Sequence, residues 1–281
     1  MSTTQTLEVV ANQNTGVPEA KNFRVTSHTA PEASSLEDGD LLVQLIFVSS
    51  DPYLRSAIRS DRPNGKKPGE AMVCFVSGKV LSSRNARWSE GDLFGGNLPV
   101  RTIQVVKKEE QTKTIMWKLT EHCTEEELSL GIGVLGMPGS TAYGGLTDIL
   151  RPKTGETLLV NAASGAVGQL VGQFAKHVFG CRVIGVAGGE EKCSALRDTF
   201  GFDDTIDYKS LGEGVEPLVA AIKKVAPGGL DMVFENVGGV QFEAGFRCLK
   251  GGGRIAVCGG IAGYGMESPL MCSIDPTAMS A

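Results

Sequence analysis

The chain has 281 residues, 41% of them hydrophobic, and a formal net charge of −5. This length is sufficient for two hydrophobic cores, and an acidic balance without a basic patch argues against a nucleic-acid partner. No apolar run is long enough to span a bilayer, and the N-terminal residues lack the basic and apolar regions of a signal peptide, so we expect a cytoplasmic protein without a membrane partner. Seven cysteines without paired spacing indicate reduced thiols rather than disulfides.

Strand-like segments separated by turns dominate the chain up to residue 135. A turn cluster at Asp61–Gly69 contains two prolines and two glycines. A short helix is expected to begin at Glu125–Leu130. We therefore predict a small, mostly antiparallel, β-rich domain over residues 1–135. Its expected strands are Leu41–Ser49, Met72–Leu81, Val100–Val106 and Thr114–Leu119.

From residue 136 onward, strands and helices alternate. This alternation predicts an α/β domain with a doubly wound parallel sheet of the Rossmann type over residues 136–281. A six-strand sheet of this type has the order 3-2-1-4-5-6, and we count only five strands here, so the last strand is expected to be lacking. The expected strands are Thr157–Asn161, Arg182–Ala187, Thr205–Tyr208, Leu230–Phe234 and Gly253–Cys258, and the expected helices are Gln169–Val178, Glu191–Phe200, Glu213–Val225 and Gln241–Leu249, with another helix opening at Gly136.

The turn after the first of these strands carries the most specific signal in the chain. It reads Ala163-Ser-Gly165-Ala166-Val167-Gly168 and lies between a strand and a helix. Glycines in that context let backbone N–H groups approach a pyrophosphate, and the helix N-terminus adds a partial positive charge. The first glycine of the usual G-x-G-x-x-G pattern is replaced by Ala163. We predict a dinucleotide site in which Ala163, Gly165, Ala166, Val167 and Gly168 bind the cofactor.

The end of the second strand indicates which dinucleotide binds. An NAD site places an Asp or Glu there to hold the ribose 2′-hydroxyl, whereas this chain has Ala187-Gly188-Gly189. Lys192 follows on the next helix and can pair with a 2′-phosphate. Glu190 and Glu191 leave NADH open because either carboxylate could hold a ribose hydroxyl, although the helix dipole also favours acids at this position. We favour NADPH, with Gly188 and Lys192 in its phosphate site.

Several motifs together resemble a known family. It is the zinc-independent branch of the medium-chain dehydrogenases/reductases, and within it the chain is most similar to prostaglandin reductases and NADP-dependent alkenal double-bond reductases. The resemblance implies a chaperonin-10-like catalytic domain, a Rossmann domain, and NADPH-dependent reduction of the C=C bond of α,β-unsaturated ketones or aldehydes, including 15-oxoprostaglandins. It also implies a homodimer. The motifs are Asp51-Pro-Tyr-Leu-Arg55, Gly136-Met-Pro-Gly-x-Thr-Ala-Tyr143, the glycine turn, Glu191-Lys-Cys193, Gly201-Phe-Asp203 and Glu235-Asn-Val-Gly-Gly239.

The same resemblance implies roles for residues outside the glycine turn. Thr141, Tyr208, Asn236 and Cys258 match cofactor-binding positions, and Tyr208 matches one beside the 2′-phosphate. Tyr264 matches a tyrosine that lies beside the nicotinamide and the substrate carbonyl, whereas Tyr53 matches a position that lines the cleft. A tyrosine hydroxyl stays protonated at neutral pH and can stabilise an enolate oxygen, so Tyr264 and Tyr53 are the candidate catalytic residues. For Tyr53, a purely structural role at the edge of a core is an equal alternative.

No metal is expected. A catalytic zinc site needs three ligands from Cys, His or carboxylates, but the chain has three histidines and no two closely spaced cysteines. Where zinc alcohol dehydrogenases carry a Gly-His-Glu ligand motif, this chain reads Lys67-Pro-Gly-Glu70.

The last 23 residues, Gly259–Ala281, depart from the family pattern. The family resemblance predicts a sixth strand, a helix and a return segment at this point, and without them the fifth strand is left at a sheet edge. Two alternatives to an alkenal reductase therefore remain open. One is a quinone oxidoreductase of the same superfamily, and the other is a truncated nucleotide-binding protein without full activity.

Overall fold

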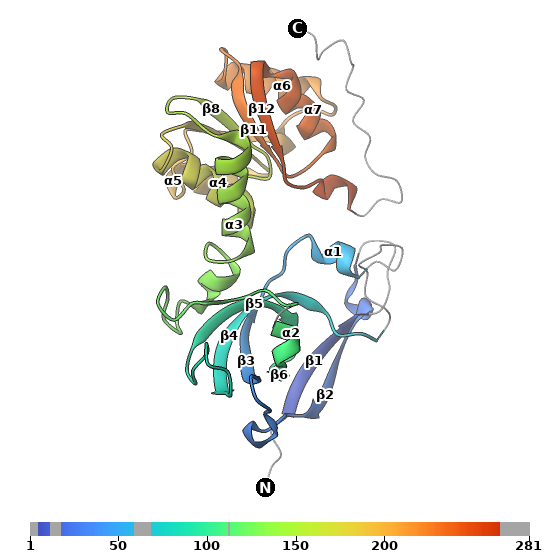
Figure 1. Ribbon diagram of the computed structural model, residues 1–281. Helices are drawn as coiled ribbons and strands as arrows, with labels where there is room; N and C mark the ends of the chain where they lie inside the picture. The colour runs from blue at the N-terminus through green and yellow to red at the C-terminus, as the bar shows by residue number, and fades with distance from the viewer. Residues whose placement is uncertain (1–4, 12–17, 59–68, 112, 265–281) are drawn as a thin grey trace. The chain divides into compact units, whose positions relative to one another are not determined.

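The computed structural model describes residues 5–11, 18–58, 69–111 and 113–264, and the chain divides into two compact units, Met1–Met137 and Pro138–Ala281 (Figure 1). Each unit has its own sheet and its own buried core. The boundary predicted after residue 135 lies near this division. Most of the predicted turn cluster, and the C-terminal segment from residue 265 with Cys272, lie outside the described residues. None of the helices in the described segments has the length and apolarity needed to cross a bilayer.

The first unit is built on antiparallel strands. Its elements are β1 (Gln5–Ala11), η1 (Ala20–Asn22), β2 (Phe23–Thr29), η2 (Ala33–Ser35), β3 (Leu41–Val48), α1 (Leu54–Ala57), β4 (Val73–Ser83), β5 (Leu93–Pro99), β6 (Ile103–Val106), α2 (Lys108–Gln111), β7 (Met116–Lys118) and η3 (Leu128–Ile132). One sheet has the order β6-β3-β4-β5-β7, and β1 pairs with β2 in a separate ribbon. The core of the sheet is formed by apolar side chains such as Val76, Val80 and Phe94.

This unit differs from the sequence-based expectation in several elements, and strands β1 and β2 are among those that were not predicted. Strand β5 was not predicted because Gly95 and Gly96 interrupt its apolar pattern, yet the sheet requires a small residue there. A β-carbon at Gly95 would lie 2.3 Å from the indole of Trp117 on the neighbouring β7. The helix expected at Glu125–Leu130 is instead the 3-10 helix η3, which begins three residues later at Leu128.

The second unit contains a parallel five-stranded sheet. Its strands are β8 (Thr157–Val160), β9 (Arg182–Ala187), β10 (Asp204–Asp207), β11 (Leu230–Glu235) and β12 (Leu249–Val257). The order is β10-β9-β8-β11-β12, and every neighbouring pair is parallel. This order equals 3-2-1-4-5 of a doubly wound sheet, in which ligands bind where the order reverses, here between β8 and β11. The predicted α/β architecture with a β-rich N-terminal part is confirmed.

Helices cover both faces of the sheet, as Figure 1 shows. On one face, α4 (Ala166–His177) and α5 (Glu190–Asp198) pack with Leu158 and Val160, and on the other, α6 (Glu216–Val225) and α7 (Gly239–Arg247) pack with Leu159. The side chains of β8 thus alternate between two cores, which explains its unbroken apolar sequence. The remaining elements are α3 (Met137–Gly144), the short π-helical segment η4 (Gly145–Leu150), and the 3-10 helices η5 (Tyr208–Ser210) and η6 (Ile261–Gly263).

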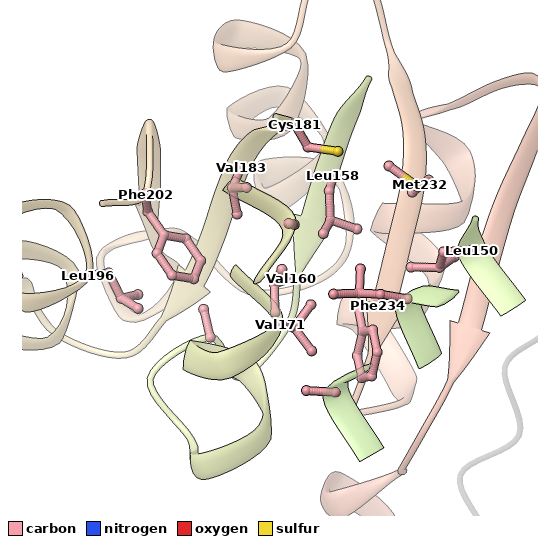
Figure 2. Packing of buried hydrophobic residues seen from close by; sticks show 14 of the residues in the cluster. Leu150, Leu158, Val160, Val171, Cys181, Val183, Leu196, Phe202, Met232 and Phe234 are labelled. Carbon is pink, nitrogen blue, oxygen red and sulfur yellow. The ribbon is translucent and has the colours of Figure 1, made fainter. Parts of the chain in front are cut away.

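Phe202 fills a gap that two glycines leave open on the α4 face. Its side chain is buried beside Leu196 and Val183 in the cluster of Figure 2. A β-carbon at Gly172 of α4 would lie 2.0 Å from the Phe202 ring, and one at Gly185 of β9 would lie 2.9 Å from it. Helix α4 therefore approaches this part of the sheet only because residue 172 has no side chain.

We predict that Gly172→Ala destabilises the second unit by about 1–3 kcal/mol, because an overpacked core forces the aromatic ring or the backbone to shift. The helix propensity gained by Ala, about 1 kcal/mol, offsets only part of this cost. Gly228→Ala is the matched control, since a β-carbon at that turn meets open space. Urea unfolding monitored by circular dichroism would measure both variants, and equal midpoints would contradict the packing described here.

Candidate dinucleotide-binding site

The turn between β8 and α4 is pinned to the sheet by its own backbone. The buried Ala163 donates its N–H to the Val186 carbonyl at 3.0 Å, and Gly165 donates to the Ala162 carbonyl at 2.9 Å. Ala162 has a left-handed φ of 47°, which non-glycine residues rarely adopt and which often marks functional turns. At the start of α4, Gly165 and Ala166 are exposed, and the N–H groups of a first helical turn have no partner within the helix.

The two glycines of this turn have different functions. A β-carbon at Gly168 would lie 2.4 Å from the Ala162 carbonyl oxygen and 2.8 Å from the Ala163 α-carbon, so this position must lack a side chain for α4 to pack on the turn. A β-carbon at Gly165 would meet only the Ala162 oxygen, at 3.2 Å. Gly168 is therefore required by the fold, whereas the exposed Gly165 keeps the helix N-terminus open to a ligand.

The end of β9 lies against the segment that follows β10. A β-carbon at Gly188 would lie 2.9 Å from Cε of Lys209 and 3.0 Å from the Tyr208 ring. The Asp207 carboxylate accepts hydrogen bonds from the N–H groups of Gly189, at 2.8 Å, and of Lys209, at 3.0 Å, and so ties the two turns together. The structure thus brings Gly188 and Tyr208 together. It also adds Lys209, which the sequence analysis missed although it directly follows Tyr208.

Two lysines on the turns that follow β9 and β10 make no ion pair with the described residues. Lys192 is exposed on the first turn of α5, and neither its ammonium nor that of Lys209 makes an ion pair with the described residues. Glu190, one of the two candidate ribose ligands, instead accepts a hydrogen bond from Arg197 at 2.6 Å. Only Glu191 remains as an exposed carboxylate for a ribose hydroxyl. The Asp207 carboxylate at the end of β10 is engaged by two backbone N–H groups, as described above. The two lysines without an ion pair therefore favour a phosphate near the end of β9.

A buried polar network connects the ends of β8 and β11, where the strand order reverses. The Glu235 side chain, 1% exposed, accepts hydrogen bonds from the Asn161 amide and from the N–H groups of Val237 and Gly238, the latter at 2.7 Å. Asn236 donates from Nδ2 to the Asn161 carbonyl at 2.8 Å. The predicted residue Asn236 is thus held across the reversal point. Glu235 and Asn161, to which no role was assigned from the sequence, fix its position.

The segment after β12 folds back onto this network. Cys258 donates its N–H to the Glu235 carbonyl at 2.8 Å, and Ile261 donates to the Asn236 carbonyl at 3.2 Å. A β-carbon at Gly259 would lie 3.3 Å from the Tyr264 hydroxyl and 3.2 Å from the Asn236 carbonyl oxygen. The structure therefore places Tyr264, Cys258 and Asn236 at one end of the sheet. Among the described residues, no group forms a hydrogen bond with the Tyr264 hydroxyl.

Tyr53 and Thr141 lie on other elements. In the first unit, the Tyr53 hydroxyl accepts the N–H of Phe75 at 2.9 Å and lies 3.4 Å from the Ser49 hydroxyl. Burial raises the pKa of Tyr53, so the hydroxyl keeps its proton. These contacts give Tyr53 an anchoring role and still leave its proton as a donor. In the second unit, Thr141 is half-buried on α3, next to the core residue Ala142.

The part of the second unit that contains Gly188, Lys192, Tyr208 and Lys209 is called the phosphate edge below. A cavity of 340 Å³ opens beside it. Tyr208 forms part of its wall, so the ring that contacts Gly188 also faces this space. A separate cavity of 280 Å³ in the first unit, lined by Trp88 and Trp117, contains none of the predicted site residues. The 340 Å³ cavity is lined by Tyr208, Leu211, Gly212, Gly214, Leu218, Val237, Gly238, Gly239, Val240, Gln241 and Ala262.

Known proteins that match the chain decide its family. A model described as zinc-binding dehydrogenase matches residues 166–279, and one described as the N-terminal domain of oxidoreductase matches residues 8–115. The NADP(+)-dependent 2-alkenal reductase of Nicotiana tabacum is 39% identical over 266 residues, which are 92% of this chain and 73% of the relative. The chain belongs to the medium-chain dehydrogenase/reductase family.

Other members of the medium-chain family match over similar lengths. Prostaglandin reductase 1 of Sus scrofa is 38% identical, over 90% of this chain and 72% of the relative, and the NADPH-dependent curcumin reductase of Escherichia coli (strain K12) is 36% identical, over 91% and 70%. The crystal structure of CurA from Vibrio vulnificus in complex with NADPH has a TM-score of 0.82 and 36% identity, and covers 98% of this chain and 77% of that chain. The resemblance seen in the sequence is confirmed.

In this medium-chain family member, the described residues bring no three His, Cys, Asp or Glu side chains close enough together to hold a metal ion. The zinc-independent reaction expected from the sequence stays a prediction.

We predict that Gly165→Val abolishes NADPH binding and leaves the fold intact, because its β-carbon and methyl groups would occupy the exposed helix N-terminus. Gly168→Ala should instead lower the free energy of unfolding, by roughly 1–3 kcal/mol, because its β-carbon collides with backbone. Fluorescence titration with NADPH and thermal unfolding would separate the two effects. A Gly165→Val variant that binds NADPH normally would remove this turn from the site.

At the phosphate edge, Lys192→Ala should weaken NADPH binding by about 1–3 kcal/mol, the usual value of a charge-assisted hydrogen bond, and should change NADH binding little. Lys209→Ala is expected to act in the same direction. Lys224→Ala, which removes an exposed lysine from α6, is the matched control. Equal losses for NADPH and NADH in the same titration would refute the assignment.

Proposed function

We propose that the chain is an NADPH-dependent reductase of the activated C=C bond of α,β-unsaturated ketones and aldehydes. The observation that carries this proposal is the phosphate edge of the second unit, where Lys192, Tyr208 and Lys209 lie near the end of β9, whose last residues Ala187-Gly188-Gly189 carry no carboxylate of their own. Family membership supports it, because relatives at 36–39% identity are named as reductases of alkenals, prostaglandins and curcumin.

The residues present fit the cofactor from one end to the other. Ala163, Gly165, Ala166, Val167 and Gly168 would hold its pyrophosphate at the N-terminus of α4. The phosphate edge, with Gly188, would hold the 2′-phosphate. Asn236, Cys258 and, by resemblance, Thr141 would hold the nicotinamide half. When bound, NADPH supplies the hydride.

The chain must stabilise the negative charge that develops on the substrate carbonyl oxygen as the β-carbon is reduced. Tyr264 is the proposed donor, because its hydroxyl has no hydrogen bond to the described residues and lies beside the Gly259 backbone, at the end of the sheet where Asn236 is held. A neutral phenol that donates to a developing enolate stabilises the transition state more than the ground state. Tyr53, which keeps its own proton, is proposed as a second polar group for the substrate.

The proposal extends to the partners of the protein. Its substrate is a small molecule, since every relative named above is an enzyme named for a small-molecule substrate. We extend it to a homodimer on the family resemblance alone. Size-exclusion chromatography with light scattering would measure the mass of the particle directly.

The decisive experiment compares NADPH oxidation with a 2-alkenal, a 15-oxoprostaglandin and a quinone in parallel. We predict activity with the first two, and a decrease in kcat of about 10- to 1,000-fold for Tyr264→Phe, the usual effect of removing one oxyanion donor. NADPH affinity should stay nearly constant, because the hydroxyl acts on the transition state.

Tyr143→Phe is the control for this substitution. Tyr143 is exposed, and its ring packs edge-to-face on Phe174 with 6.1 Å between centroids, a contact that phenylalanine keeps. If Tyr264→Phe retains its kcat in single-turnover hydride transfer, Tyr264 only shapes the pocket. If the wild-type chain oxidises NADPH with the quinone alone, the quinone oxidoreductase alternative replaces the proposal.

A further inference from the structure

The 340 Å³ cavity in the second unit has almost entirely apolar walls. Leu211, Leu218, Val237 and Val240 supply most of its side-chain surface, and several glycines expose only backbone. Among the described lining residues, Tyr208 and Gln241 alone carry polar side-chain groups. A cavity with apolar walls and few polar groups is typical of a site for a small molecule or cofactor, in which each polar group fixes the orientation of the ligand.

Gln241 stands out because its carboxamide is unsatisfied. It lies on the first turn of α7, and its Oε1 atom is shut off from water without a hydrogen bond to the described residues. Burying an amide oxygen without a donor costs free energy, and native structures rarely leave such an atom unpaired. The Gln241 residue as a whole is half-buried and lines the cavity, so a change of side-chain rotamer, rather than a flip of the amide alone, would bring both amide atoms to face a ligand there.

The phosphate edge determines which part of the cofactor reaches this cavity. Tyr208 contacts Gly188 at that edge and forms part of the cavity wall. In NADPH the 2′-phosphate is attached to the ribose that carries adenine. A phosphate held by Lys192 and Lys209 therefore directs the adenine ring past Tyr208 and into the apolar cavity, with its polar edge toward the remaining polar side chain.

We propose that Gln241 reads the amino edge of adenine, with its carboxamide oxygen accepting from the 6-amino group and its amide N–H donating to N7. This inference rests on the proposed NADPH site and adds a residue that selects the base. Glutamine forms this two-bond contact with adenine when proteins read DNA, because the donor and acceptor of the amide match those of the base edge. Hypoxanthine replaces the amino donor with a carbonyl acceptor, so the contact cannot form.

The test is equilibrium binding of NADPH and of reduced nicotinamide hypoxanthine dinucleotide phosphate, measured by calorimetry with the full chain. The wild type should prefer NADPH about 10-fold or more, and Gln241→Met should bring the ratio of the two dissociation constants close to one. Met fills a similar volume without a strong donor or acceptor. Gln241→Ala, which favours helix formation, should give the same ratio, so the result does not depend on one side chain.

Gln173→Met provides the matched control. Gln173 lies on α4, and its amide donates to the Gln169 carbonyl of the same helix at 3.2 Å, so this variant should keep the wild-type preference. If the wild type binds both nucleotides equally, or if both Gln241 variants keep its preference, the role of Gln241 is refuted while the NADPH site stands. If the wild type binds neither nucleotide, the proposed function fails, and the base-reading role fails with it.

Discussion

Helix α4 approaches the β8 turn so closely that residue 168 has no room for a side chain. The Ala162 carbonyl lies 2.4 Å from the place where a β-carbon would be, and the same carbonyl accepts the N–H of Gly165. This contact fixes the direction of α4 and places its N-terminus at the carboxyl end of the sheet. The left-handed conformation of Ala162 is part of the same arrangement, because it turns the chain from the strand into the helix within a few residues.

Charge is distributed around this contact in two different ways. At the reversal point, the buried carboxylate of Glu235 accepts hydrogen bonds from backbone N–H groups and from the Asn161 amide, which hold the loop after β11 in place. At the edge of the sheet, the ammonium groups of Lys192 and Lys209 lie exposed on two adjacent turns. The interior polar groups thus set the geometry, and the surface cations are left to bind an anion.

The sequence was most informative where strands are buried on both faces. The bounds predicted for β9, Arg182–Ala187, are those of the structure, and each of the other parallel strands was found within a few residues. Strand β5 was missed because its two glycines look like a turn, and the reason for Gly95 is Trp117, a residue on another strand. Local patterns cannot show a requirement that a distant side chain imposes.

The candidate site divides in the same way. The glycine turn and Lys192 are recognisable from spacing, because each residue acts through its place on one strand or helix. Two residues could be recognised only in the folded chain. Lys209 lies beside Gly188 because the turn after β10 packs against the end of β9. The Gln241 amide stands out because its oxygen has no hydrogen-bond partner among the described residues. For Tyr53, the sequence motif indicated a catalytic residue, but the structure shows that its hydroxyl oxygen accepts a hydrogen bond from a backbone N–H.

Strand β10 has only four residues and pairs on one side alone within the described sheet. Short edge strands open at a lower free energy than the whole domain, so brief local openings there are expected to precede global unfolding. Asp207, at the end of β10, joins the turns of Gly189 and Lys209 through hydrogen bonds. Each local opening would therefore separate the residues of the phosphate edge from one another, while the glycine turn would stay in place. Slow amide hydrogen exchange in these two turns would therefore report cofactor occupancy, since a bound 2′-phosphate stabilises only the closed state.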